Sequence, residues 1–213
     1  MKGLDKLGKI ILASKSPRRK EILEKINLDH FLVPNILYRR GTSYERLDDW
    51  KNAEKNLSEE QKEIYSIVLE AHKQSMEQAK PGNKWNLMHE KSVEVIVEGL
   101  ISLGLLEGSK EENIETGAYS KFYMHRIGHW LGMDVHDVGG YKKDGDWRQL
   151  EEGMVMTVEP GIYILDTLEG VDDKWKGIGV RIEDDISITN SGFALLTPNV
   201  PRTIEEVEHT VQG

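Results

Sequence analysis

The stretch GVRIEDDISIT, residues 179–189, alternates apolar and polar side chains with the two-residue period of a β-strand. Its apolar face consists of Val180, Ile182, Ile186 and Ile188, and its polar face of Arg181, Glu183, Asp185 and Ser187. The ordinary explanation of such a polar face is exposure to water. The alternative is that its carboxylates line a cavity or a metal site, because a buried carboxylate needs a counter-charge or a cation.

A second strand is predicted at MVMTVEPG, residues 154–161, and we expect it to end at Pro160-Gly161. Glu159 would then be the last side chain before a tight turn. Rigid strand ends often present catalytic groups to a cleft, whereas the ordinary alternative is a carboxylate on the surface. Glu159 and Glu183 are therefore two candidates for chemistry.

Two helices are predicted upstream of these strands. SEEQ, residues 58–61, has the pattern of a capping box, and apolar residues follow it at helical spacing. We expect this helix to end at Pro81-Gly82, and a second helix to run from Asn86 to Leu103, where Gly104 stops it. Helices followed by strands indicate an α+β fold.

Three of the chain's seven histidines lie in MHRIGHWLGMDVHD, residues 124–137, at positions His125, His129 and His136. A helix would put His125 and His129 on one face, but Gly128 and Gly132 equally suit an extended segment in close backbone contact. A lone histidine is usually structural, whereas a cluster beside strand glutamates suggests a metallohydrolase. Imidazole and carboxylate ligands together suit manganese, cobalt, iron or zinc better than calcium.

The composition narrows the class of protein. The net charge of −9 and the pI of about 5.3 argue against a partner among nucleic acids. The absence of cysteine excludes disulfides and thiolate zinc sites and fits a reducing compartment. Apolar runs fall short of the ~18 residues of a membrane-spanning helix, so we expect a cytoplasmic protein without a membrane partner.

Three separated segments closely resemble the Xaa-Pro aminopeptidases, relatives of prolidase and methionine aminopeptidase. They are FYMHRIGHWLGMDVHDVGGY (122–141), LEEGMVMTVEPGIYI (150–164) and GIGVRIEDDISIT (177–189). LSEEQKEIYSIVLEAHKQSMEQAKPG (57–82) resembles the helix that precedes that site, so the likeness runs from about residue 57 to about residue 208. The resemblance implies the pita-bread fold and hydrolysis of the peptide bond before a proline in second position.

The same resemblance assigns roles to individual residues. The family holds two divalent metals, commonly Mn²⁺, which share a water or hydroxide. It implies metal ligation by His129, Glu159 and Glu183, contact with substrate and transition state by His125 and His136, and support of the site by Arg181. The implied substrate is a peptide with proline in second position.

The family also needs two aspartate ligands upstream, and their pattern is absent from LYRRGTSYERLDDWKNAEKN, residues 37–56. Asp48 and Asp49 are neighbours, and neighbours on a strand point to opposite faces. Three ligands are too few for two ions, so we expect one ion or none. The rival hypothesis is an inactive remnant or interaction module, whose partial sheet without the family's first strands has an open edge for pairing with another chain or copy.

The N-terminal segment KIILASKSPRRKEILEKI, residues 9–26, resembles the opening of Maf-like nucleotide pyrophosphatases. By that resemblance the triphosphate of a nucleotide would contact Ser14, Ser16, Arg18 and Arg19. The ordinary alternative is a capped helix with an exposed basic turn. The predicted organisation is a strand-loop-helix fragment over 1–34, a linker over 35–56, and a partial pita-bread domain over 57–213, and nucleotide binding is a weaker functional alternative.

Overall fold

The computed structural model describes residues 56–212. The nucleotide-binding prediction at Ser14, Ser16, Arg18 and Arg19, and the two aspartates Asp48 and Asp49, lie outside the described residues. The division at residues 34 and 56 is likewise a proposal that the described residues do not test.

The two long helices begin and end close to the predicted positions. α3 (Glu59–Met76) starts with the capping box, because Ser58 Oγ accepts from the Gln61 N–H and the Gln61 side chain accepts from the Ser58 N–H. α3 ends before Pro81-Gly82, in turns that include Gly82 at φ +85°. α4 (Asn86–Ser102) is followed by Gly104 at φ +70°. The shorter helices are α5 (Lys110–Thr116), the 3-10 helix η3 (Ala118–Lys121) and α6 (Ile204–Gln212).

The strands are antiparallel. β3 (Val155–Val158), β6 (Asp184–Ile188) and β7 (Phe193–Leu195) form a sheet in the order β3-β6-β7. β4 (Gly161–Tyr163) pairs with β5 (Gly179–Arg181), and β1 (Lys142–Lys143) forms a hairpin with β2 (Asp146–Trp147). Within residues 56–212 β7 lies at an edge of its sheet, and pairing of such an edge with another chain stays a prediction.

Both predicted strands are interrupted in the middle. The chain does not turn at Pro160-Gly161 as expected, because β4 resumes at Gly161 directly after β3. The predicted strand 179–189 likewise divides into β5 and β6 at Ile182 and Glu183. Pro160 has no N–H to donate, and its carbonyl accepts a long bond of 3.4 Å from the Ile182 N–H. The break is thus a local loss of hydrogen bonds within two continuing strands.

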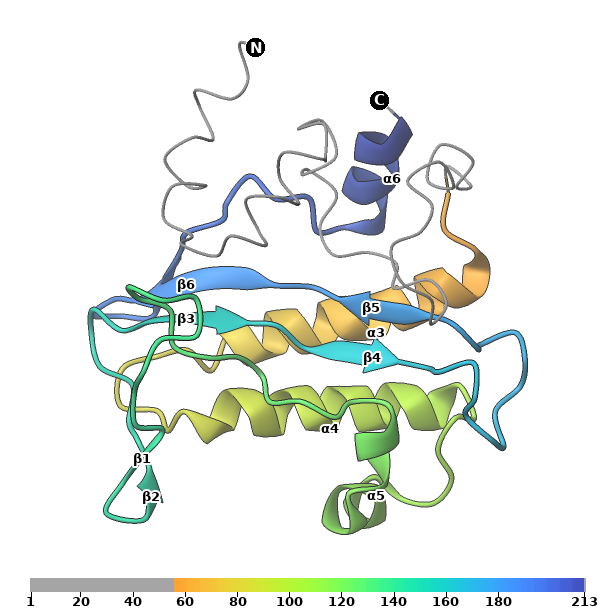
Figure 1. Cartoon of the computed structure of the whole chain (residues 1–213), viewed down its shortest axis with the longest axis horizontal. Coiled ribbons are helices and arrows are strands. Elements are labelled where there is room, and N and C mark those ends of the chain that lie inside the picture. The colour runs from red at the N-terminus through yellow and green to blue at the C-terminus, as the bar shows by residue number, and fades with distance from the viewer. Residues whose placement is uncertain (1–55, 213) are drawn as a thin grey trace.

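The apolar faces of the strands pack on α3 and α4, which run alongside them (Figure 1). The predicted apolar face is confirmed, since Val180, Ile182, Ile186 and Ile188 are all buried. α6 packs against α3, and the Leu57 N–H donates to Glu208 Oε1 at 3.0 Å. Because helices and strands pack together in both buried apolar clusters, the predicted α+β class is confirmed.

In the part of the chain that the structure describes, no helix combines the length and the apolarity that crossing a bilayer demands.

Candidate metal centre

Strand register brings Glu159 and Glu183 face to face. Val158 pairs with Asp184 on one side of the strand break, and Gly161 pairs with Arg181 on the other. The two pairings share one register, so its continuation through the break sets Glu159 opposite Glu183. Residues directly opposite in an antiparallel pair have Cβ atoms roughly 4.5–5.5 Å apart. The sheet therefore presents two carboxylates on the face turned away from α3 and α4.

His129 arrives from the other side of β3 on an extended segment, so the helical alternative for His125 and His129 is wrong. The His129 carbonyl accepts from the Thr157 N–H at 3.0 Å, and the Ile127 carbonyl accepts from the Glu159 N–H at 2.7 Å. A Cβ atom on Gly128 would lie 2.1 Å from the Thr157 carbonyl oxygen. Glycine is thus required there for the two backbones to approach.

The three side chains converge. His129, Glu159 and Glu183 each offer a ligand atom within 4.8 Å of the other two. His129 Nε2 lies 3.4 Å from Glu159 Oε1, and the Glu159 side chain is only 11% exposed. His129 Nδ1 lies 2.9 Å from the Trp130 carbonyl, which can only accept, so the proton belongs on Nδ1 and the lone pair on Nε2 faces the carboxylates.

Thr157 links two of these candidate ligands and was missed by the sequence analysis. Its hydroxyl accepts from the His129 N–H at 3.0 Å and donates to Glu159 Oε1 at 2.9 Å. Thr157 is 2% exposed. The only sequence signal was the two-residue spacing from Glu159, which sets both side chains on one strand face.

The electrostatics of the cluster favour a cation. Burial, and next the facing Glu159 carboxylate, raise the pKa of Glu183 from 4.5 to about 7. Burial, and then the neighbouring Asp184, raise the pKa of Asp185 on the same face. One imidazole nitrogen and two carboxylates in mutual reach form a donor set that suits a first-row divalent metal. The residues present therefore fit such an ion.

His136 lies beside His129. Their rings meet edge to face, with centroids 4.3 Å apart, and His136 is exposed. His136 is therefore at the rim of the cluster, where a substrate can reach it.

His125 and Arg181 are joined on the other side of the cluster through Tyr163, a second residue that the sequence analysis missed. The Tyr163 hydroxyl lies 2.9 Å from His125 Nε2 and accepts from Arg181 Nε at 2.8 Å. Arg181 Nη1 also lies 3.3 Å from Glu159 Oε2, and its supporting role stays a prediction. Burial lowers the pKa of His125, so its ring is neutral near pH 7.

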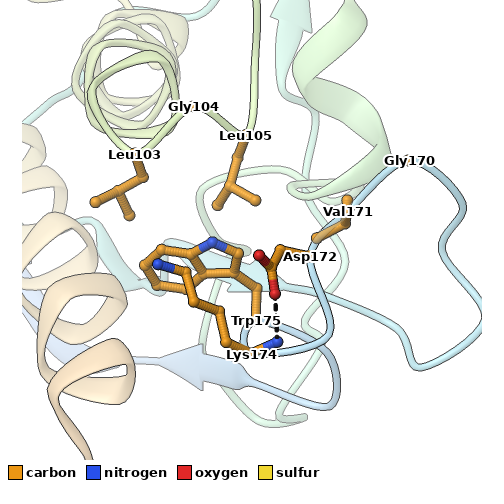
Figure 2. A pocket seen from close by; sticks show the side chains of 8 residues that line it. All are labelled: Leu103, Gly104, Leu105, Gly170, Val171, Asp172, Lys174 and Trp175. Atoms are coloured by element: carbon orange, nitrogen blue, oxygen red, sulfur yellow. Dashed lines mark hydrogen bonds between the residues drawn. The ribbon is translucent and has the colours of Figure 1, made fainter.

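A separate pocket of about 260 Å³ lies where α4 ends, between Leu103, Leu105, Val171 and Trp175 (Figure 2). None of the candidate site residues lines it. Its walls hold no histidine and a single carboxylate, that of Asp172, so the pocket offers little for catalysis.

A comparison with known protein families identifies the family to which the chain belongs. The model of metallopeptidase family M24 matches residues 52–190, which is more than half of the chain. This chain belongs to metallopeptidase family M24. A divalent metal is accordingly the cofactor class that its family implies.

Individual M24 relatives agree with this assignment. The chain is 47% identical over 152 residues to an Xaa-Pro aminopeptidase of Haemophilus influenzae, covering 71% of this chain and 35% of the relative. Aminopeptidase PepP of Pseudomonas aeruginosa superposes with a TM-score of 0.74 at 54% identity, covering 75% of this chain and 36% of that one. A zinc-substituted Escherichia coli aminopeptidase P in complex with product matches at 44% identity with a TM-score of 0.70, covering 74% and 36%.

These comparisons confirm the resemblance to Xaa-Pro aminopeptidases and the partial pita-bread fold of the described region. The chain spans about a third of the length of the curated relatives it matches. The Maf-like segment 9–26 lies outside the M24 match as well as outside the described residues, so that resemblance finds no support here.

Proposed function

We propose that this chain is a metallopeptidase module of the Xaa-Pro aminopeptidase type, which hydrolyses the N-terminal peptide bond before a proline in second position. The observation that carries the proposal is the convergence of His129, Glu159 and Glu183 within 4.8 Å of one another. A peptide is the proposed substrate, with no nucleic acid or membrane partner, and the cytoplasm is the proposed location.

We propose Mn²⁺ as the cation and one ion per chain. Within residues 56–212 the cluster contains three ligand side chains, which suffice for one ion if solvent completes its shell. When bound, a divalent cation supplies an acidified water near neutral pH and polarises the scissile carbonyl.

The protein's own groups do the remaining work. The Trp130 carbonyl and the Thr157 hydroxyl hold His129 and Glu159 in fixed directions. Neutral His125 carries its one proton on Nδ1, which lies 2.8 Å from the Arg126 carbonyl, so its Nε2 accepts from the Tyr163 hydroxyl and fixes the direction of that hydroxyl. His136 at the rim is set to contact the peptide.

The test measures metal binding and peptide cleavage in the full 213-residue chain. We expect calorimetry to find one Mn²⁺ per chain, and mass spectrometry to find release of the first residue from a peptide with proline second but not from its alanine analogue. Glu183→Gln should abolish both, whereas Glu107→Gln, at an exposed carboxylate after α4, should change neither.

The rival function is a non-catalytic interaction module. It is favoured by the small ligand set within residues 56–212, compared with the larger set that the family resemblance implies. Binding of Mn²⁺ without turnover at saturating metal would support this rival and refute the peptidase.

A further inference from the structure

Asp184 is a buried carboxylate on the apolar face of β6, next to Glu183. Its side chain is 0% exposed, because the alternation of the strand gives this position to the core although the residue there is charged. It accepts hydrogen bonds from the Thr197 hydroxyl and from Nε and Nη2 of Arg202. His72 Nε2 of α3 lies 3.3 Å from Asp184 Oδ2, the oxygen that also accepts from Arg202 Nε. A buried carboxylate with this many partners is held in one direction.

Arg202 is itself anchored at several points. Its Nη1 donates to the Val200 carbonyl at 2.8 Å, and its own carbonyl accepts from the Tyr65 hydroxyl of α3 at 2.7 Å. Its N–H donates to Glu206 Oε2 at 2.9 Å. The guanidinium is therefore fixed relative to α3 and to the start of α6.

The segment 196–202, which ends at Arg202, also binds the backbone of β6. The Thr197 hydroxyl accepts from the Asp185 N–H at 3.2 Å, and the Asp185 carbonyl accepts from the Leu196 N–H at 2.8 Å. The two residues that follow Glu183 are thus held by side chain and by main chain.

Glu183 itself stands at the strand break. On its N-terminal side the bond from the Ile182 N–H to Pro160 is long, at 3.4 Å, and Pro160 has no N–H to return. The sheet therefore holds the backbone weakly at Ile182 and Glu183, between the paired Arg181 and the first firm anchor after the break, Asp184. Since neighbours on a strand point to opposite faces, fixing Asp184 toward α3 directs Glu183 toward His129 and Glu159.

We propose that Arg202 is a positioning residue, which holds Asp184 and thereby directs the Glu183 carboxylate into the metal cluster. The inference rests on the proposed function, in that Glu183 is taken as a metal ligand. Burial lowers the pKa of His72 to about 4, so near neutral pH its ring is uncharged and Arg202 supplies the positive charge that Asp184 needs.

The test compares Arg202→Lys and Arg202→Met with Val207→Ala in the full chain. Lysine keeps the charge but loses the planar fork that binds a carboxylate through two nitrogens. Val207 is 3% exposed on α6, so its truncation weakens the packing of the same segment without removing a partner of Asp184. Thermal unfolding without metal shows which variants remain folded. It also shows whether the Arg202 variants and Val207→Ala have similar stability.

We expect Mn²⁺ affinity by calorimetry to fall roughly 10- to 100-fold in the Arg202 variants, the usual loss when a group that orients a metal ligand is removed. Val207→Ala should stay within about twofold of the original chain, because the orientation of Glu183 is untouched. Unchanged affinity in folded Arg202→Lys, or an equal loss in Val207→Ala, overturns the inference.

A second readout separates this inference from the proposed function. In metal-free protein, the NMR signal of the Glu183 amide should move in Arg202→Lys and stay in Val207→Ala. If the original chain takes up no Mn²⁺, the proposed function fails, and the amide comparison still decides whether Arg202 positions Glu183. An unmoved Glu183 amide refutes the positioning role in either case.

Discussion

At the scale of single residues, Thr157 shows how one hydroxyl can organise a site. It satisfies the His129 N–H and donates to Glu159, so two candidate ligands share one polar partner. Because Thr157 is buried, water cannot replace it. The group is small, yet both ligand directions depend on it.

Thr157→Val tests this role by replacing the hydroxyl with a methyl group of similar volume. We expect Mn²⁺ affinity to fall roughly 10-fold or more, and the free energy of unfolding to fall by about 1–3 kcal/mol, because the part-buried His129 N–H loses its acceptor. Calorimetry and urea unfolding measure the two effects. Thr157→Ser keeps the hydroxyl and is the control, and equal behaviour of the valine and serine variants would contradict the role.

Gly128→Ala tests the close approach of the histidine segment to β3. The added methyl would lie 2.1 Å from the Thr157 carbonyl oxygen, a backbone atom with no freedom to rotate away. We expect a loss of about 1–3 kcal/mol in the free energy of unfolding, measured in urea. Gly192→Ala is the control, since nothing lies within 4 Å of the atom that it adds. A Gly128 variant as stable as the control would disprove the contact.

At the scale of secondary-structure elements, α3 and β6 meet through a buried histidine. Neither ring nitrogen of His72 makes a well-directed hydrogen bond, although Nε2 lies 3.3 Å from Asp184. Burial outweighs the attraction of Asp184 and lowers the His72 pKa from 6.5 to about 4. The packing of helix on strand therefore requires an uncharged ring.

This requirement predicts acid sensitivity. Below pH 6.5 the unfolded chain takes up a proton that folded His72 refuses until about pH 4. The free energy of unfolding should therefore decline between these values, by up to about 3 kcal/mol from this residue. Urea unfolding from pH 7 to pH 4 measures the slope. His72→Asn should flatten it and His209→Gln, at an exposed histidine, should not; an equally steep slope without His72 would contradict the assignment.

Much of this element-level structure could be predicted from the sequence, because it follows from local rules. The capping box at Ser58 and the two-residue period after Gly179 depend on neighbours along the chain. The break at Pro160 was mistaken for a turn because proline and glycine punctuate both. The pairing of Asp184 with Arg202 could not be predicted, since Arg202 is distant in sequence and comes from a segment without a recognisable pattern.

At the scale of the whole molecule, the candidate site joins segments that are far apart in the chain. His129, Glu159 and Glu183 were predicted as a set from the family resemblance, and their convergence agrees with that expectation. Tyr163 and Thr157 were missed because tyrosine and threonine in a strand carry no signal of their own. Such roles follow only from three-dimensional contacts.

Metal binding should therefore stabilise the whole fold. An ion that binds only the folded chain adds about 2.7 kcal/mol at a free concentration 100 times its dissociation constant. We expect the midpoint of thermal unfolding to rise with Mn²⁺ and to return to its starting value after chelation. In Glu183→Gln the rise should be lost, and a midpoint that ignores Mn²⁺ in the original chain would argue against the site.

The hydrogen bond between Leu57 and Glu208 has a topological consequence. It brings the first and last described elements within contact, so a short peptide could join them and new chain ends could be opened at the exposed hairpin tip around Asp144. In such a circular permutant the order of the metal-binding segments along the chain would change while their neighbours in space would not. The site would thus depend on how these segments lie in space and not on the order in which they are synthesised.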